Sequence, residues 1–341
     1  MSSSCVNNRT PRTYSESGVS LELASVVGQS LSRILDFDDK SIVVGLGGFA
    51  GVIEIPGTDL CLAVSADSIG TKTILAAKYG RLPTIGYDLV NHCVDDSICH
   101  GASPIVFLDY IGHVDLSAEA ISEVVSGVAN ACRGEGIVLI GGETAQLPGV
   151  LRDSVFDLVG FIAGIAHRNR IIDGNGICAG DRIIALPSNG LHTNGYSLAR
   201  KIFDDDALER QYNGVSVKDM LLAPHTSYRK PVVALTEYIT VKGIAHITGG
   251  GIRKNLARIL PDDVDAVVRK DCVQIPEIFS IIESIGVPEN EMYDVFNMGI
   301  GMLVVVAKSD ITESFDILNK HGAKPADAGT IVKGTGQVSL E

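Results

Sequence analysis

The sequence is poor in several features that would assign it to a particular class of protein. It has no tryptophan, and its apolar runs stop well short of the ~20 residues that a membrane-spanning helix requires. Its 28 Lys and Arg residues are outnumbered by 41 Asp and Glu residues, which gives a net charge of -13. Nucleic-acid surfaces depend mainly on Lys and Arg. We therefore expect no membrane and no nucleic acid among the partners.

The first 18 residues, MSSSCVNNRTPRTYSESG, lack the apolar core of a signal peptide. The cysteines are odd in number, and no two are spaced as CxxC. These observations favour a cytoplasmic protein with reduced thiols, mostly in the core, over one with disulfides or a cysteine metal site. The seven are Cys5, Cys61, Cys93, Cys99, Cys132, Cys178 and Cys272.

Length and composition indicate a well-packed α/β enzyme. A chain of 341 residues makes about two domains, and 45% hydrophobic against 20% charged residues is typical of a globular fold. Expected strands alternate with expected helices, and a second α/β unit opens with the strand RIIALPS. We place the domain boundary near residue 170, giving domains 1–170 and 171–341. Expected strands include 60–67, 103–114, 137–143 and 157–166, and expected helices 71–80, 85–102 and 118–136.

One strand ends in the unusual stretch ADSIGTK, residues 66–72. Asp67, Ser68 and Gly70 are good turn formers, and from these residues alone an ordinary turn is the favoured interpretation. The alternative is that a carboxylate, a flexible backbone and the ammonium of Lys72 together hold a phosphorylated ligand and its metal.

A strongly acidic helix face is the second candidate feature. At 100° per residue, Asp88, His92, Asp95 and Asp96 share about a third of the helix circumference. Such a face is usually solvated. Here the strand-like GASPIVFLDY follows at once, so the helix is expected among core strands, where its carboxylates would need a cation such as Mg²⁺.

Glycine-rich segments supply weaker signals. GLGGFAG (45–51) allows close backbone approach to a phosphate but matches no standard nucleotide loop. LIGGETAQLPG contains Glu143, and LPSNGLHTNGYSL contains Ser188, His192 and Asn194 before a helix start, which is a natural anion site. Taken alone, His192 is more simply a capping or packed imidazole.

Taken in order, these motifs resemble the aminoimidazole ribonucleotide synthetases, also called phosphoribosylformylglycinamidine cyclo-ligases. The resemblance runs from Tyr14 to AGTIVKG near the C-terminus. Its strongest carriers are GLGGFAG, DSIGTK, IGYDLVNHCVDD, FLDY, GGETAQLPG, GLHTNGYSL, HITGGGIRKNLARILP and EMYDVFNMGIGM.

The resemblance implies a reaction and roles for particular residues. ATP would phosphorylate the amide oxygen of formylglycinamidine ribonucleotide, and a neighbouring nitrogen would then close the imidazole ring, giving aminoimidazole ribonucleotide. Such an enzyme works mainly by positioning and electrostatics. The implied metal ligands are Asp67 and Asp96, for Mg²⁺. The implied nucleotide site comprises Gly47, Gly48, Asp67, Thr71, Lys72 and Asp88; the implied substrate site comprises Ser188, His192, Asn194 and Gly195; the implied catalytic residues are His192, Lys72 and Glu143.

The family also implies an architecture. An α+β chain of two α/β domains would pair its N-terminal mixed sheet with that of a second subunit into a barrel, and a C-terminal α/β sandwich would complete the active-site cleft. We therefore expect a homodimer that acts on a small-molecule substrate.

Several positions depart from the family pattern. Tyr14, Ser15 and Glu16 replace a tyrosine-lysine-aspartate opening; Ser68, Lys254 and the segment PHTSY (224–228) also differ. Asp95 stands where asparagine is common, and Gln146 where glutamate is common. If Asp95 and Gln146 border one pocket, the exchange conserves its charge; otherwise each faces solvent independently.

Three other functions remain as alternatives. A thiamine-phosphate kinase or a selenophosphate synthetase would share the aspartate loop but should lack HITGGG followed by FNMGIGM. A non-catalytic binding or scaffold paralogue would keep the fold after losing turnover. The chain's retained candidate residues argue against this alternative: Asp67, Lys72, Asp96, Glu143 and His192. A metal-binding redox protein is disfavoured by the cysteine spacing.

Overall fold

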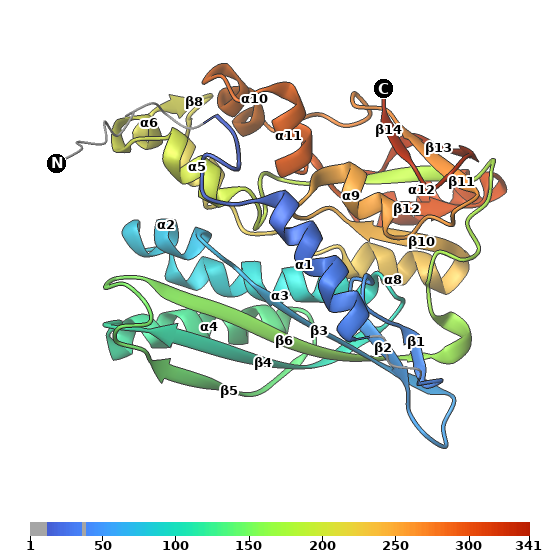
Figure 1. The fold of residues 1–341 in the computed structure, drawn as a ribbon, viewed down its shortest axis with the longest axis horizontal. Helices are drawn as coiled ribbons and strands as arrows, with labels where there is room; N and C mark the ends of the chain where they lie inside the picture. Colours follow the sequence, from blue (N-terminus) through green and yellow to red (C-terminus); the bar gives the residue numbers. More distant parts are fainter. Residues whose placement is uncertain (1–11, 36–38) are drawn as a thin grey trace.

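The computed structural model describes residues 12–35 and 39–341, and it contains two six-stranded mixed sheets flanked by helices (Figure 1). All strands of the first sheet precede Arg168, and all strands of the second follow Asp181. The chain is therefore a two-domain α/β protein. The division at residue 170 falls in the connection between the sheets and stays a proposal.

The first sheet has the strand order β1-β2-β3-β6-β4-β5 and is antiparallel except for the parallel pair β4–β5. Its strands are β1 (Ile42–Val44), β2 (Gly51–Glu54), β3 (Leu60–Ser68), β4 (Ser103–His113), β5 (Val138–Gln146) and β6 (Phe156–His167). The helices of this half are α1 (Leu21–Ile34), α2 (Lys72–Lys78), α3 (Leu82–Ile98), α4 (Ala118–Gly134) and η1 (Arg168–Arg170).

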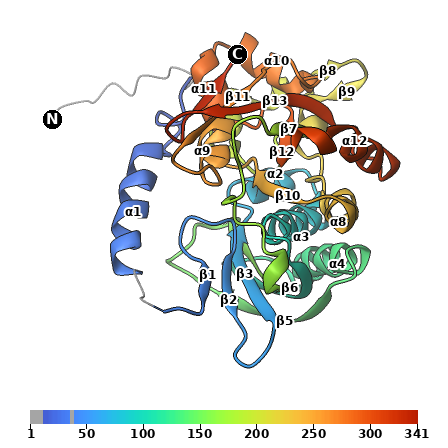
Figure 2. The ribbon, with the colours of Figure 1, turned by 90° about the vertical axis from the view of Figure 1, so that its right-hand side faces the viewer.

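Helices α3 and α4 cover one face of the first sheet and not the other (Figures 1 and 2). Residues such as Phe107 and Leu158 are completely buried beneath the helices. On the opposite face Val64, Leu108 and Phe161 are each more than 40% exposed. One apolar face of this sheet is thus open in the single chain.

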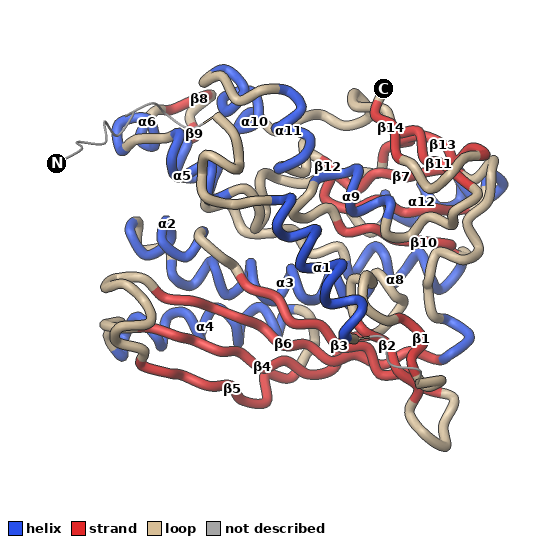
Figure 3. Tube along the Cα trace, viewed as in Figure 1, coloured by secondary structure: helices blue, strands red, loops and turns tan. Residues whose placement is uncertain are grey.

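The second sheet has the order β10-β12-β7-β13-β11-β14 and is antiparallel except for β11–β14. Its strands are β7 (Arg182–Pro187), β10 (Val241–His246), β11 (Val264–Val268), β12 (Ile300–Val306), β13 (Ala326–Lys333) and β14 (Val338–Leu340). A separate hairpin is formed by β8 (Gln211–Tyr212) and β9 (Val215–Ser216). The helices, distinguished from strands by colour in Figure 3, are α5 (Tyr196–Ile202), α6 (Asp205–Glu209), α7 (Val217–Leu221), α8 (Arg229–Tyr238), α9 (Gly251–Ala257), α10 (Glu277–Ser284), α11 (Glu289–Val295), η2 (Lys308–Asp310) and α12 (Ile311–Lys320).

The two halves meet along helix α3, which contacts α8 of the second half as well as the strands of the first sheet. A single cluster of buried apolar side chains runs through both halves. Every one of the 17 residues of α3 from Leu82 to Ile98 except Pro83, Thr84, Tyr87 and Asn91 is buried. Side chains on this helix therefore lie between the two sheets.

The expected strands and helices of the N-terminal half are present, but the ends of two of them differ from those expected. The strand expected at 60–67 is β3, but it continues through Ser68, so the turn of ADSIGTK is confined to residues 69–71. The helix expected at 85–102 is found at Leu82–Ile98. It ends early because Gly101, with φ of 72°, adopts a left-handed conformation that turns the chain into β4.

Two further expectations concern the whole chain. In the described part of the chain, no helix combines the length and apolar character needed to span a bilayer. Of the cysteines there, Cys61, Cys93, Cys99 and Cys132 are buried free thiols, and Cys178 and Cys272 are also free. Cys5 lies outside the described residues.

Candidate active site between the two domains

The centre of the site is a fully buried lysine at the start of α2. Lys72 Nζ donates hydrogen bonds to Asp88 Oδ1 at 2.8 Å and to the carbonyl oxygens of His192 and Ala223, both at 2.9 Å. Burial lowers the pKa of Lys72, and the Asp88 carboxylate opposes this shift. All three ammonium hydrogens are engaged, so Lys72 joins α2, α3 and two loops of the C-terminal domain. As a phosphate contact, Lys72 stays a prediction that requires one of these bonds to break.

The acidic face of α3 is buried rather than solvated. The exposed fractions of Asp88 and Asp95 are 0%, those of His92 and Asp96 6% and 7%. The cation that the sequence predicts for this face is supplied for Asp88 by Lys72, from within the chain. Asp88 also accepts a hydrogen bond from the backbone N–H of His225 at 2.7 Å.

His92 links the helix to the end of strand β3. Its Nδ1 lies 2.5 Å from Thr193 Oγ1, and its Nε2 lies 3.4 Å from Asp67 Oδ1. Burial alone would lower the pKa of His92, but the Asp67 carboxylate raises it to about 9. Conversely, burial raises the pKa of Asp67, but the His92 imidazolium outweighs this and holds it below its usual range. The pair is therefore ionised near neutral pH.

Asp67 and Asp96 lie close enough for their carboxyl groups to interact electrostatically. Burial, and after it the Asp67 carboxylate, raise the pKa of Asp96 well above its usual range. A divalent cation between the two carboxyls would offset the repulsion that raises this pKa. Asp67 keeps 26% of its side chain exposed, so oxygen ligands and solvent access coexist there. This donor set fits Mg²⁺.

The expected substrate loop is held in a strained conformation over this site. His192 has φ of 60°, unusual for a residue other than glycine, and is only 2% exposed. Ser188 Oγ donates to Asn297 Oδ1 at 2.8 Å. Gly195 precedes α5 with φ of 82°, and a Cβ there would lie 2.2 Å from the Phe296 ring. Asn194 Nδ2 donates to Thr193 Oγ1 at 3.3 Å.

Two histidines that were not singled out from the sequence complete the site. His246, the last residue of β10, has its Nδ1 2.7 Å from Asp96 Oδ1. His225, in the loop before α8, stacks on His192 with ring centroids 4.0 Å apart. Burial lowers the pKa of His192, His225 and His246 well below the usual range, which leaves all three imidazoles neutral.

The glycine-rich loop is attached to the C-terminal domain by Arg258. Its guanidinium donates to the carbonyl oxygens of Gly47 and Gly48 and lies 3.9 Å above the centre of the Phe49 ring. A Cβ on Gly48 would lie 2.4 Å from Val44 Cγ1, so only glycine fits there. Thr71 Oγ1, 3.3 Å from Ser197 Oγ, forms another link between the domains.

Glu143 does not join this cluster within one chain. It lies exposed on β5, an edge strand of the first sheet, whereas Asp67 is on β3, with β6 and β4 between the two strands. Glu143 could take the catalytic role predicted for it only if a second protein surface met this edge of the sheet.

Of the two interpretations of Asp95 and Gln146, independent exposure to solvent holds for Gln146 and is wrong for Asp95, and the two side chains have different partners within one chain. Asp95 faces neither solvent nor Gln146: it is fully buried, accepts from the backbone N–H of Tyr228 at 2.8 Å, and has Oδ2 3.3 Å from His225 Nε2. Gln146 is exposed at the end of β5 and donates to the carbonyl of Val114. The Asp95 carboxylate instead contacts the loop that carries His225.

Sequence reasoning missed His225, His246 and Arg258 as members of the site. His246 and Arg258 lie in the quoted motif HITGGGIRKNLARILP, and His225 lies in PHTSY, which was noted only as a departure. The unusual histidine in PHTSY was the available signal for His225.

Models of protein families match both domains of the chain. Residues 47–166 match the N-terminal domain, and residues 179–340 the C-terminal domain, of the AIR synthase related proteins. The chain belongs to this family. Among curated relatives, phosphoribosylformylglycinamidine cyclo-ligase of Clostridium perfringens strain 13 is 42% identical over 94% of this chain and 97% of its own. The cyclo-ligase of Alkaliphilus oremlandii is 40% identical over 96% of this chain and 99% of its own.

Solved structures of lower identity share the fold. Thiamine monophosphate kinase from Aquifex aeolicus aligns with a TM-score of 0.64 at 15% identity, covering 95% of this chain and 98% of its own. Hydrogenase maturation protein HypE in complex with ATP aligns with a TM-score of 0.63 at 18% identity, covering 92% and 90%. At these identities the likeness concerns architecture alone.

Proposed function

We propose that the chain is an ATP-dependent phosphoribosylformylglycinamidine cyclo-ligase, a cytoplasmic ligase of purine biosynthesis. It converts formylglycinamidine ribonucleotide into aminoimidazole ribonucleotide. The observation that carries this proposal is identity near 40% to cyclo-ligases along nearly the whole chain. The buried polar cluster between the domains supports it, because phosphoryl transfer depends on fixed charges and positioned reactants.

Asp67 and Asp96 would hold Mg²⁺, which neutralises phosphate charge when bound. His92 keeps Asp67 ionised and orients it. The backbone of Gly47 and Gly48, fixed by Arg258, would lie along the nucleotide, with Thr71 and Asp88 supporting that side. Lys72 would act chiefly as a positioning residue, since its hydrogens hold the carbonyls of His192 and Ala223.

His192, Ser188, Asn194 and Gly195 would face the ribonucleotide. Ser188 and Gly195 shape the loop, and His192 and Asn194 offer polar atoms to the substrate. Neither ring nitrogen of His192 has a protein partner, so one of them is free to contact the substrate.

The open face of the first sheet would be covered by a second copy of the chain, forming a homodimer with a barrel-like core. Its exposed apolar side chains, including Val64, Leu108 and Phe161, are the reason. The same assembly would bring the exposed Glu143 against a partner, which accounts for its distance from the cluster in one chain.

The decisive experiment measures ATP-dependent turnover of formylglycinamidine ribonucleotide, following aminoimidazole ribonucleotide through its diazotisable amine. We expect product that depends on ATP and Mg²⁺. Asp67→Asn and Asp96→Asn should each raise the Mg²⁺ concentration needed for activity while leaving the unfolding transition cooperative.

Thiamine monophosphate serves as the comparison substrate. Its ATP-dependent phosphorylation, without cyclisation of formylglycinamidine ribonucleotide, would favour the kinase alternative; no turnover of either would favour a non-catalytic paralogue.

A further inference from the structure

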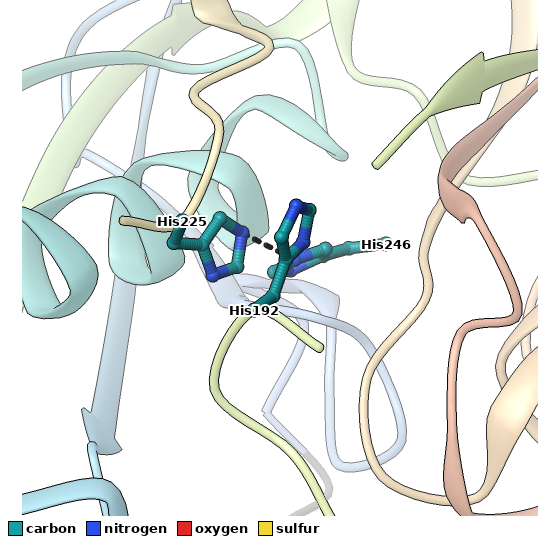
Figure 4. Close-up of side chains that lie close together, drawn as sticks. All are labelled: His192, His225 and His246. Carbon is teal, nitrogen blue, oxygen red and sulfur yellow. Dashed lines mark hydrogen bonds between the residues drawn. The ribbon is translucent and has the colours of Figure 1, made fainter. Parts of the chain in front are cut away.

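Three histidine side chains from three separate segments converge between the domains (Figure 4). His192 comes from the loop before α5, His225 from the loop before α8, and His246 from the end of β10. One ring nitrogen of each lies within 4.8 Å of those of the other two, and all three residues are buried.

These rings carry polar atoms that no protein group satisfies. Both ring nitrogens of His192 and Nδ1 of His225 are buried without a hydrogen-bond partner. An unpaired buried polar atom costs free energy, and native proteins usually pair such atoms with protein, water or an ion. The cluster thus points to an occupant, because packing alone does not explain three unpaired ring nitrogens, two on His192 and one on His225.

The spacing of one pair of these rings matches a tetrahedral metal. His225 Nε2 and His246 Nε2 lie 3.3 Å apart, as the dashed line in Figure 4 marks. A tetrahedral Zn²⁺ with Zn–N bonds of about 2.0–2.1 Å places its ligand nitrogens roughly 3.3–3.4 Å from one another. The ring of His192 has no hydrogen bond to break when it turns toward the same point.

Asp96 supplies the outer support that metal-binding histidines usually have. Its Oδ1 lies 2.7 Å from His246 Nδ1, leaving Nε2 of that ring directed at His225. Such carboxylate–histidine–metal arrangements fix the ring and increase ligand basicity. His92, Asp96 and His246 form a second possible ligand set, but His92 already uses both nitrogens on Thr193 and Asp67.

We propose that His192, His225 and His246 bind one divalent transition-metal ion, with Zn²⁺ as the best fit, and that Asp96 orients His246. Neutral imidazoles favour such ions, whereas Mg²⁺ prefers the carboxylate oxygens of Asp67 and Asp96. The site shares His192 with the proposed substrate loop and Asp96 with the proposed Mg²⁺ site, but its metal content can be measured without the reaction. His225 belongs to the segment PHTSY, where the chain departs from the family pattern, so the site is expected of this chain and not of the family in general.

The test uses the full chain, purified without a polyhistidine tag. The protein is unfolded, stripped with chelator, refolded with Zn²⁺ or Co²⁺, separated from free metal and analysed for metal content and visible Co²⁺ absorption. We expect about one ion per chain and the intense d–d bands of tetrahedral Co²⁺.

Three variants locate the ion. His225→Gln should lose the metal and the Co²⁺ bands, and Asp96→Asn should retain the site with affinity lowered about 10–100-fold. His167→Gln, an exposed histidine at the end of β6, is the matched control and should bind as the original chain does. Circular dichroism establishes that each variant is folded before metal is measured.

If the original chain is folded and binds no metal, the proposal is overturned and water remains as the occupant of the cluster. Binding that is unchanged in His225→Gln would overturn it as well, by placing the ion elsewhere. Neither result bears on the cyclo-ligase assay, which measures product in Mg²⁺ alone, so failure of one proposal is distinguishable from failure of the other.

Discussion

The space between the two domains and the outer face of the first sheet reverse the usual distribution of polarity. Between the domains the chain buries Lys72, Asp88, Asp95 and several histidines. On the outer face it leaves large apolar side chains such as Phe161 exposed. Burying charge costs free energy unless partners compensate it, and exposed apolar area invites association. The first region therefore indicates a ligand site, and the second an interface. Four predictions test this contrast, ordered by their expected effect on the stability of the chain.

The largest effect is expected from Lys72→Met. It leaves Asp88 buried without a counter-charge, and breaking a buried pair in this way costs about 3–5 kcal/mol. Urea unfolding of the purified chain measures the loss. Lys78→Met, which removes an exposed ion pair with Asp205, is the control and should change stability little. Equal effects of the two substitutions would mean that the interior charges are not strongly coupled.

The second effect is a pH dependence of stability arising from His92. Asp67 raises the pKa of His92 from 6.5 to about 9 in the folded chain. The group thus contributes stability that is fully present below about pH 6.5 and is lost as the pH rises through about 9, by at most about 3 kcal/mol.

Urea unfolding in chelator between pH 6 and pH 10 measures this slope. Asp67→Asn should flatten it, because the shifted pKa depends on the carboxylate. Asp157→Asn is the control. It alters an aspartate of β6 that is not part of the Asp67–His92 pair, so the slope should be kept. A slope that persists in Asp67→Asn would assign it to another group.

The third effect concerns the contact between the glycine loop and the C-terminal domain. Arg258→Lys removes a planar group that stacks on Phe49 and contacts the carbonyls of Gly47 and Gly48. Because the side chain is exposed, we expect a loss of only about 0.5–1 kcal/mol. The KM for ATP should rise more than kcat falls, since the loop is proposed to lie along the nucleotide. An unchanged KM would separate this loop from the nucleotide site.

The smallest effect on the chain itself should come from the open sheet face. Leu108 and Phe161 are cross-strand neighbours on β4 and β6, each more than 40% exposed. Replacing both with lysine should alter the stability of the separate chain by no more than about 0.5 kcal/mol per site. Sedimentation should nevertheless show a shift from dimer to monomer.

Tyr238→Lys on α8, at a residue that is 72% exposed and not part of this sheet, is the control and should remain dimeric. A dimer that survives the double substitution would remove the reason for treating this face as an interface.

The architecture was largely predictable because it follows from local patterns. The apolar run LCLAVS in β3 and the helical pattern of residues 118–136 made these elements predictable, and both lie close to where they were expected. The end of α3 was misplaced, since one left-handed glycine, Gly101, terminates a helix whose apolar pattern continues. The family resemblance also followed from the order of motifs along the chain.

The site was only partly predictable. Asp67, Lys72, Asp88, Asp96 and His192 do come together, but the role of Lys72 looks different once its three hydrogen bonds are known. Glu143 is far along the sheet from Asp67. His225 and His246 are separated from α3 by more than a hundred residues, and no local pattern links them to it.

Residue order was thus sufficient for the family, the succession of strands and helices, and the segments that carry the chemistry, because these depend on short-range periodicity and motif spacing. The raised pKa values of His92 and Asp96, the hydrogen bonds of Lys72 and the meeting of three histidines emerged from the packing of the two domains. Each of these depends on distances of a few ångströms between residues remote in the chain, and on the exclusion of water when the second domain closes over α3. Electrostatic interactions strengthen when water is removed, so the same side chains acquire their properties from that closure and not from their neighbours in sequence.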